Sequence, residues 1–193
     1  MFASKTPIES PKGPRPCADY FVGDPVMAAS AAADGSWTWA AGIVEFSSGT
    51  GGEQPAMVFI HFGDEGALVV TADQPVLIAG GKLKRADQLV PGDDRLVAAG
   101  GGDLEIAQVS IGPVTGGIHD IATGLSSNLD WDGSLDGHLL NVSGVICGDF
   151  ILQIRHGDPR MAHYLAQGPS IGSPEYAAAH RPVNEHDHRP DLS

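Results

Sequence analysis

The chain has 193 residues, of which 42% are hydrophobic, and its formal net charge is −13 at pH 7. This length can bury one sizeable core, and the mean hydropathy of −0.03 is typical of a soluble globular protein. Binding to a phosphate backbone requires clustered Lys and Arg, so the acidic balance argues against nucleic acid as a partner. No apolar run is long enough to cross a bilayer, and we therefore expect no membrane span.

The first fifteen residues contain no apolar stretch of the kind that forms the core of a secretory signal. The compartment is therefore open between the cytoplasm and secretion as part of a larger protein whose signal lies upstream. The chain has two cysteines, Cys17 and Cys147. We expect both to be small buried side chains, since free cysteine is among the most often buried residue types.

The distribution of glycine and proline predicts a fold built from short strands. The chain contains 26 Gly and 14 Pro, and glycines cluster at residues 80–81, 100–102 and 116–117, where they favour turns. No segment has the length and periodicity of a long helix, although the alanine-rich stretch that begins at Ala28 is compatible with one helical turn. Trp37 and Trp39 alternate as they would in a strand or an exposed platform, and we predict that they bind a partner.

Short motifs follow one another along the chain in a definite order, beginning at the N-terminus. Thr6 and Ile8 come first, Gly13 follows, and residues 22–26 have the sequence VGDPV. Gly supplies the conformational freedom that a tight reversal needs.

Further motifs occupy the middle and the end of the same region. An apolar strand ends at Thr71, three residues before Gln74, and residues 84–93 follow with the pattern Ala-x-x-Leu-x-x-Gly-Asp, which is typical of a turn. Residues 117–121, with the sequence GIHDI, are expected to form a strand. The last motif covers residues 138–149 and ends in Gly-Asp.

This series of motifs resembles the Hint (Hedgehog/intein) domain, in a bacterial type of that superfamily. The resemblance covers residues 1 to about 153 and implies an all-β, horseshoe-like Hint fold over residues 1–154, followed by an extended, His- and Pro-rich C-terminal tail over residues 155–193. The apolar residues that fall in strand-like stretches beside Gly or Pro turns are expected to line one elongated β core. They are Ile8, Val22, Val26, Val69, Val76, Leu77, Leu89, Val97, Ile121, Leu140, Val145 and Ile151.

The resemblance also implies where a self-processing site would lie, and the chain departs from the family there. Hint domains begin with a nucleophilic Cys or Ser, polarise the scissile peptide bond with a His and end in Asn, whereas these positions hold Met1, Gln74 and Asp149. A thioether cannot attack a carbonyl, and a Gln amide cannot transfer a proton as an imidazole does. A carboxylate is a poor nucleophile for the ring closure that Asn performs. Thr71 and Asp120 match the family.

We therefore predict a remnant of an autoprocessing site, formed by Thr71, Gln74, Asp120 and Asp149, that does not splice. The chain is expected to act as a protein-binding or structural module rather than as an enzyme, with partner contacts through the two tryptophans and the tail. Its oligomeric state is open. Met1 also leaves an alternative open, because it could stand in the place of a Cys at a processing junction.

Histidines support a rival hypothesis. His119 and His138 lie in two late segments that a Hint topology brings toward the site, and His with nearby carboxylates is a ligand set for a transition metal. The rival function is a metal-assisted hydrolase or a residual self-cleaving domain. The eight His lack the spacing of common metal motifs, so no cofactor is expected under the favoured hypothesis. His186 and His188 in the tail could chelate a metal weakly.

Overall fold

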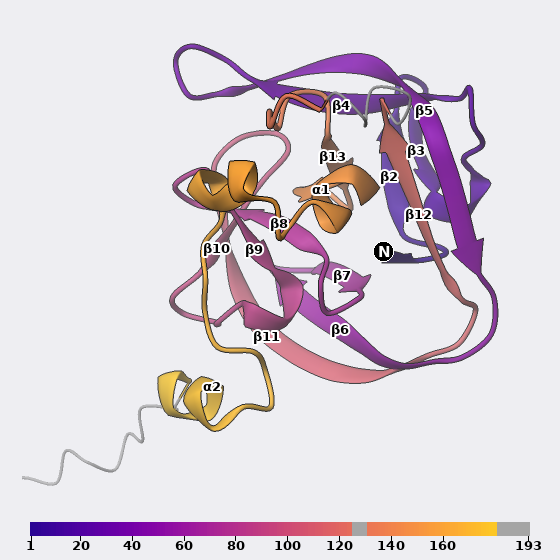
Figure 1. Ribbon diagram of the computed structural model, residues 1–193. Coiled ribbons are helices and arrows are strands. Elements are labelled where there is room, and N and C mark those ends of the chain that lie inside the picture. Colours follow the sequence, from indigo (N-terminus) through magenta and orange to yellow (C-terminus); the bar gives the residue numbers. More distant parts are fainter. Residues whose placement is uncertain (125–130, 181–193) are drawn as a thin grey trace, which may run out of the picture.

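The computed structural model describes residues 1–124 and 131–180, which form a nearly all-β fold (Figure 1). The helical elements are short: the 3₁₀ helices η1 (Cys17–Asp19), η2 (Ala86–Gln88) and η4 (Pro159–Tyr164) and the α-helices α1 (Phe150–Ile154) and α2 (Pro174–Ala179). The strands are β1 (Phe2–Ala3), β2 (Pro7–Ser10), β3 (Gly13–Pro16), β4 (Pro25–Ala31), β5 (Trp37–Thr50), β6 (Gln54–Phe62), β7 (Gly66–Val70), β8 (Pro75–Ile78), β9 (Lys82–Arg85), β10 (Arg95–Val97), β11 (Asp103–Val114), β12 (Ile118–Thr123), β13 (Leu139–Val142) and β14 (Val145–Gly148). The predicted all-β class is confirmed. Within the described ranges, no helix combines the length and apolar character needed to cross a membrane.

The strands pair into one antiparallel sheet that closes on itself. The pairing order is β14-β8-β10-β11-β6-β7-β1-β12-β5-β4-β13, and β13 pairs back to β14. β2 and β3 continue from β13, and β9 pairs with β8. Figure 1 shows that the strands surround a central region, in which α1 lies near the N-terminus. This closure brings β1, β12 and β14 together although they are distant in sequence.

Two long strands link the halves of this closed sheet, because each changes partner along its length. The first half of β5 pairs with β4 and the second half with β12. Likewise, β11 pairs first with β10 and then with β6, with a register shift between Ile106 and Gln108. A register shift of this kind bends a strand and increases its twist. The bend allows one strand to contribute to both halves.

Glycine is required where β12 meets β5. Gly117 has a φ of +83°, which side chains of L-residues rarely adopt, and a Cβ at this position would collide with the carbonyl oxygen of Thr50. Ile118 then pairs with Thr50, which sets the register that puts Asp120 opposite Ser48. The position of Asp120 in the candidate site therefore depends on this close backbone approach.

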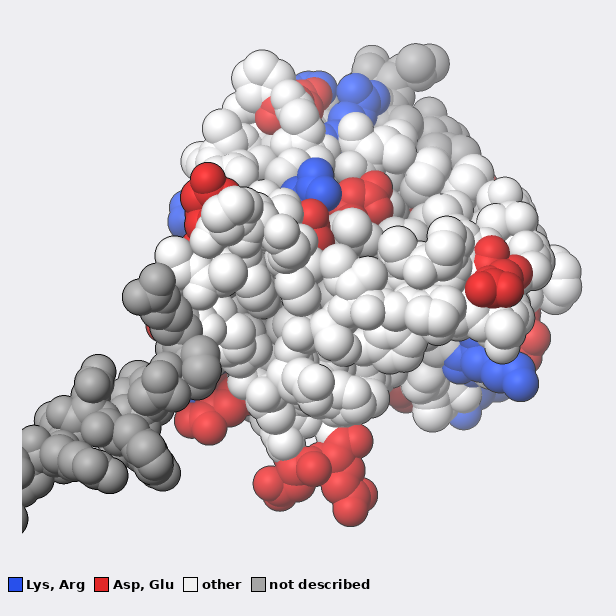
Figure 2. All heavy atoms as spheres, turned by 90° about the horizontal axis from the view of Figure 1, so that it is seen from below, with Lys and Arg blue, Asp and Glu red and all other residues white. Residues whose placement is uncertain are grey.

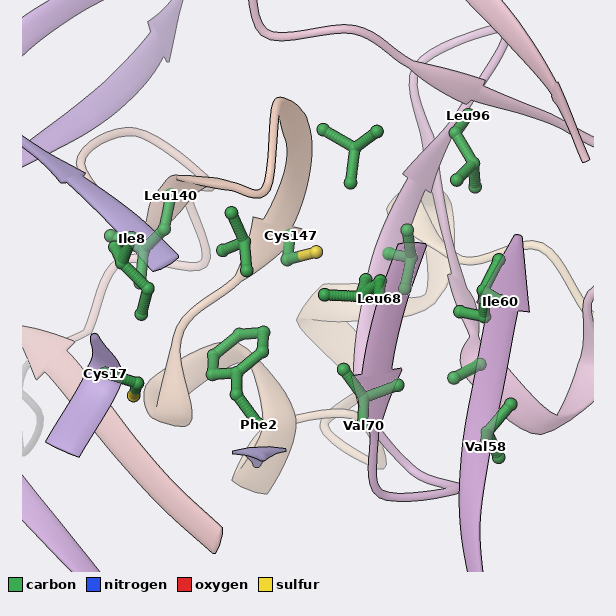
Figure 3. Close-up of a cluster of buried hydrophobic side chains, with 14 of the residues drawn as sticks. Phe2, Ile8, Cys17, Val58, Ile60, Leu68, Val70, Leu96, Leu140 and Cys147 are labelled. Carbon is green, nitrogen blue, oxygen red and sulfur yellow. The ribbon is translucent and has the colours of Figure 1, made fainter. Parts of the chain in front are cut away.

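The main apolar core fills the region between the strands (Figure 3). Phe2 is fully buried among side chains that include Val70, Leu140 and Cys147. A second cluster forms around α1, which buries Ile151. The two-residue strand β1 is thus held by the packing of Phe2 together with its pairing to β7 and β12.

Most of the residues predicted for the core are buried, but the prediction for Val22 is wrong. Val22 is 66% exposed, because residues 21–24 form a tight turn in which the amide of Asp24 donates to the carbonyl of Phe21 at 3.0 Å. Val69 and Val97 are half-buried.

The helical turn considered after Ala28 is also absent, since these residues belong to β4 and pair with β5. Sheet pairing overrides the helix propensity of alanine there.

Residues 155–180 lie along the sheet and are attached to it. The amide of Ala166 donates to the carbonyl of Leu83 at 2.8 Å, and the hydroxyl of Tyr176 donates to the carbonyl of Leu89 at 2.6 Å. Met161 is fully buried. This segment covers the outer side of β9, which would otherwise be an open edge. The domain boundary at 154 stays a prediction, and the His186 and His188 pair lies outside the described residues.

Surface charges contribute little to the fold. On the face shown in Figure 2, acidic and basic side chains form small separate groups around a broad uncharged area. Ion pairs such as Arg15–Asp24 (3.1 Å) and Arg95–Glu105 (2.8 Å) lie at exposed or half-exposed positions. Exposed pairs of this kind are worth about 0–1 kcal/mol. The stability of the domain therefore rests mainly on the buried apolar clusters.

Replacing Phe2 with Ala should destabilise the domain strongly, because the side chain is fully buried at the centre of the main core. We expect the free energy of unfolding to fall by about 3–5 kcal/mol, measured by urea denaturation at pH 7. Val22→Ala is the matched control and should change it by no more than about 0.5 kcal/mol. Equal stability of the two variants would contradict the assigned core.

Candidate functional site

The residues predicted for the remnant site come from three segments of the chain. Thr71 and Gln74 lie in the connection between β7 and β8, Asp120 lies in β12 and Asp149 follows β14. The amine nitrogen of Met1 connects three of them. It donates to Thr71 Oγ1 at 3.0 Å and to Gln74 Oε1 at 2.7 Å, and it lies 3.4 Å from Asp120 Oδ2.

Gln74 is fully buried and bridges two segments of the site. While its Oε1 accepts from Met1, its Nε2 donates to the carbonyl of Gly148 at 2.7 Å and to that of Pro75 at 3.2 Å. The side-chain amide therefore satisfies a donor and an acceptor at once. It joins the start of the chain to the segment just before Asp149.

Asp120 is a fully buried carboxylate. Its Oδ1 accepts from the amide of Ile121 at 3.0 Å, while its Oδ2 has no hydrogen-bond partner. Burial raises the pKa of Asp120 to about 6. The ammonium group of Met1 opposes this rise, and the negative charge of Asp149 adds to it. Of the two buried carboxylates in the site, Asp120 therefore accepts fewer hydrogen bonds than Asp149.

Asp149 is held by an imidazole nitrogen and two backbone amides. It accepts from His138 Nδ1 at 2.9 Å, from the amide of Thr123 at 3.0 Å and from the amide of Leu152 at 3.2 Å. The last bond makes Asp149 the N-cap of α1, a position at which Asp is strongly preferred. Burial alone would lower the pKa of His138, but the hydrogen bond to Asp149 and its charge leave that pKa above the ordinary value.

Sequence reasoning missed Gln153. Its Oε1 accepts from the nitrogen of Met1 at 2.8 Å, and its Nε2 donates to Thr71 Oγ1 at 3.3 Å. Gln153 lies one helical turn after Asp149, and its amide donates to the Asp149 carbonyl at 3.1 Å. Reading Asp149 as a helix N-cap, instead of as the end of a motif, would have indicated that the following turn folds back to the site.

The two histidines predicted as metal ligands have different partners. His119 Nε2 lies 2.8 Å from Ser47 Oγ, and burial lowers the pKa of His119. His138 instead contacts Asp149. Within residues 1–124 and 131–180, no group of three or more His, Cys, Asp or Glu side chains is arranged to hold a metal ion.

Both cysteines are free and buried, as expected. Burial raises the pKa of each thiol above its ordinary value, and the charge of Asp120 adds to the effect. Each thiol therefore stays protonated and unreactive at neutral pH. Neither Cys17 nor Cys147 is suited to replace the missing nucleophile.

Trp37 and Trp39 line a groove of about 1030 Å³ that shares no residue with the site around Met1. Both lie at the start of β5 and are half-buried. Trp39 Nε1 donates to the carbonyl of Ala99 at 3.1 Å, which holds its ring in place. The other walls include Tyr164 and two glycine-rich turns, and the charged lining residues are Asp103 and Asp136.

Comparison with solved structures identifies the fold. An intein-like domain of Clostridium thermocellum superposes with a TM-score of 0.59 at 18% identity, covering 77% of this chain and 97% of that one. A DnaB intein of Synechocystis gives 0.57 at 13% identity, with 77% and 96% covered. The Msm DnaB1 intein splicing domain, solved with bound zinc, gives 0.55 at 18% identity, with 77% and 100% covered. The predicted Hint fold is confirmed, and the chain has an intein-like Hint fold.

Identity at this level establishes the fold alone. No protein-family model matches the sequence, and no curated protein matches it either. The activities of the similar inteins are therefore not carried over by the superposition. The function has to be argued from the residues of this site.

Replacing Asp120 with Asn should change how stability depends on pH. Because the folded pKa of Asp120 is about 6, above the ordinary value of about 3.9, the folded state binds the proton more tightly than the unfolded state. The contribution of Asp120 is then fully present below about pH 4 and is lost as the pH rises through about 6. Relative to Asp120→Asn, the parent should lose about 2–3 kcal/mol between pH 4 and 7, measured by urea denaturation. A pH-independent difference would contradict this assignment.

Proposed function

We propose that this chain is a catalytically degenerate Hint-fold domain that no longer splices or cleaves itself and that acts as a protein-binding or structural module. The observation that carries the proposal is the path of the chain after Asp149. At the position where the family ends in Asn, this chain continues directly into α1. The peptide bond that a Hint domain would cut is thereby part of a packed helix.

The packing of α1 supports this proposal. The carbonyl of Asp149 accepts the first intrahelical bond from Gln153, and the side chains of Ile151 and Leu152 are fully buried. Cutting after Asp149 would separate the N-cap from its helix and detach two buried residues from the core. A domain that released this segment would lose apolar packing worth about 1.5–3 kcal/mol for each side chain.

The chemistry of the upstream position supports it as well. The thioether of Met1 is not a nucleophile toward a carbonyl, and both ends of the Gln74 amide are used in hydrogen bonds to the backbone and to Met1. An amide in this position donates and accepts hydrogen bonds but does not exchange a proton near neutral pH. The site therefore holds two segments together without the groups needed to break a bond between them.

A residual enzyme is the second candidate. His138, which is paired with Asp149, lines a hollow of about 440 Å³ together with Ser30 and Glu45. A His oriented by a carboxylate is the arrangement of a general base. The metal-assisted version has less support, because His119 and His138 contact different partners. The zinc in the similar Msm DnaB1 intein splicing domain belongs to that protein.

The groove at Trp37 and Trp39 is the surface that we propose for a partner. Aromatic rings beside Asp103 and Asp136 attract cations, because ring faces and carboxylates both carry negative potential. Two glycine-rich turns leave room for a backbone to approach closely. We propose an extended peptide segment with Pro and Lys or Arg as the partner, since aromatic grooves accept extended proline-rich chains.

Self-processing is tested with a short extension before residue 1. Incubated with thiol at neutral pH, the extended parent chain should keep its intact mass. The double variant Met1→Cys, Gln74→His should cleave slowly at the upstream junction, because a nucleophile and a proton donor are restored, and general acid catalysis contributes about 10²–10⁴-fold. Adding Asp120→Ala should abolish this cleavage.

The single variants Met1→Cys and Gln74→His serve as controls and should cleave far more slowly than the double variant. Cleavage of the parent that is lost on His138→Gln would favour the residual enzyme. A folded double variant that stays intact over days would show that the residue correspondence with the family is wrong.

Partner binding is tested by calorimetry with an acetylated hexapeptide of alternating Pro and Lys. We expect it to bind at low ionic strength and to lose affinity with added salt. Trp37→Ala and Asp103→Asn should each weaken binding about 5–10-fold, given cation–π and charge contributions of about 1 kcal/mol. The matched peptide of Pro and Glu should not bind. Equal binding of the two peptides would contradict the proposed partner class.

A further inference from the structure

Four side chains surround the nitrogen of residue 1, and we call them the amine cage: Thr71, Gln74, Asp120 and Gln153. The first contact is to Thr71 Oγ1 at 3.0 Å, followed by Gln74 Oε1 at 2.7 Å and Gln153 Oε1 at 2.8 Å. Asp120 Oδ2 lies 3.4 Å away. Every contact is made by an oxygen atom.

The number and the charge of these oxygens match a primary ammonium group. Such a group has three N–H donors, and Thr71, Gln74 and Gln153 each offer one neutral acceptor to it. Asp120 supplies the opposite charge, and its Oδ2 is buried with no hydrogen-bond partner. A peptide nitrogen has one N–H and no charge, so it would leave two of the neutral acceptors and the carboxylate unsatisfied.

We propose that the amine cage is a binding site for a primary ammonium group, and that the α-amine of residue 1 is its ligand in any form of the chain in which that amine is free. The fold then responds to the chemical state of residue 1, because a free amine completes the cage and an amide does not. This role goes beyond partner binding and uses the residues of the former reaction centre. It applies to any chain in which residue 1 carries a free amine, however that amine arises.

Apart from the ammonium group, the charged side chains near Asp120 and the amine are negative. Asp149 is the other charged group that acts on Asp120, and it is negative, although its hydrogen bond to His138 occupies one of its oxygens. Asp73, exposed but close to Thr71 and Gln153, adds a further negative charge that interacts with the amine. A buried carboxylate without a counter-ion is strongly unfavourable. The ammonium group is therefore the counter-ion of Asp120.

An amide at residue 1 would be disfavoured by its chemistry. The side chain of Met1 is 27% exposed, so residue 1 lies near the surface. The two neutral acceptors could take water in place of the lost N–H groups. Asp120 would then have no cation to replace the ammonium group.

The proposal is tested by comparing three forms of the same chain: one with a free amine at Met1, one N-acetylated, and one with a short Gly-Ser extension. A fusion cut by a protease that leaves no residue before Met1 yields the free form, and intact mass verifies each product. At pH 7 both blocked forms should melt about 5–10 °C below the free form, since breaking a buried ion pair is strongly destabilising.

Two variants test whether the ion pair between Asp120 and the amine causes the difference in melting temperature between the free and blocked forms. In Asp120→Asn the gap between free and blocked forms should nearly vanish, because no buried charge remains to be neutralised. Gln153→Ala should narrow the gap, because one acceptor is lost and the carboxylate stays. Asp64→Asn, at an exposed position, is the matched control and should keep the full gap.

The pH dependence supplies an independent readout. The ammonium group lowers the pKa of Asp120, so the carboxylate takes up its proton at a higher pH in a blocked form than in the free form, and the gap should shrink as the pH falls from 7 to 5. Equal melting temperatures of the free and blocked forms at pH 7 would overturn the proposal. An unchanged difference in melting temperature in Asp120→Asn would overturn the proposal too. If Asp120→Asn does not fold, an unchanged difference in Gln153→Ala would overturn it instead. The self-processing assay is independent of these measurements, so cleavage there would reject the proposed function without affecting this result.

Discussion

The buried amide of Gln74 connects segments that lie far apart in sequence, and the geometry of the site depends on it. It accepts from the nitrogen of Met1 and donates to the carbonyl of Gly148, so it links β1, β8 and β14 at the centre of the closed sheet. Because the side chain is fully buried, removing either bond would leave an unsatisfied polar group at a cost of about 1–3 kcal/mol. Gln74 thus has a structural role at the centre of the fold.

The chain segment that follows Asp149 contributes a further residue, Gln153, to the site. Asp149 caps α1, the helix buries Ile151 and Leu152, and the same turn returns Gln153 to the nitrogen of Met1. The segment that follows Asp149 is therefore an integral part of the core.

The groove beside Trp37 and Trp39 and the site around Met1 are built from different residues. Partner binding at the groove would therefore leave the buried polar network intact. The long strand β5 is the physical connection between them, since its first half carries the two tryptophans and its second half pairs with β12.

The sequence by itself determined the fold class, through the glycine turns and the order of short motifs, and it identified Thr71, Gln74, Asp120 and Asp149 as a group. These features are local patterns of turn chemistry and spacing, which a sequence displays directly. Closure of the sheet decided the contacts between distant residues, which local sequence patterns do not contain. It put Gln153 against Met1, left Asp120 without a hydrogen bond to Oδ2, and gave His119 and His138 separate partners. Val22 became exposed because a turn replaced the expected strand end. The reason is that contacts between buried polar atoms depend on which distant strands pair, and long-range pairing is decided by packing of the whole chain.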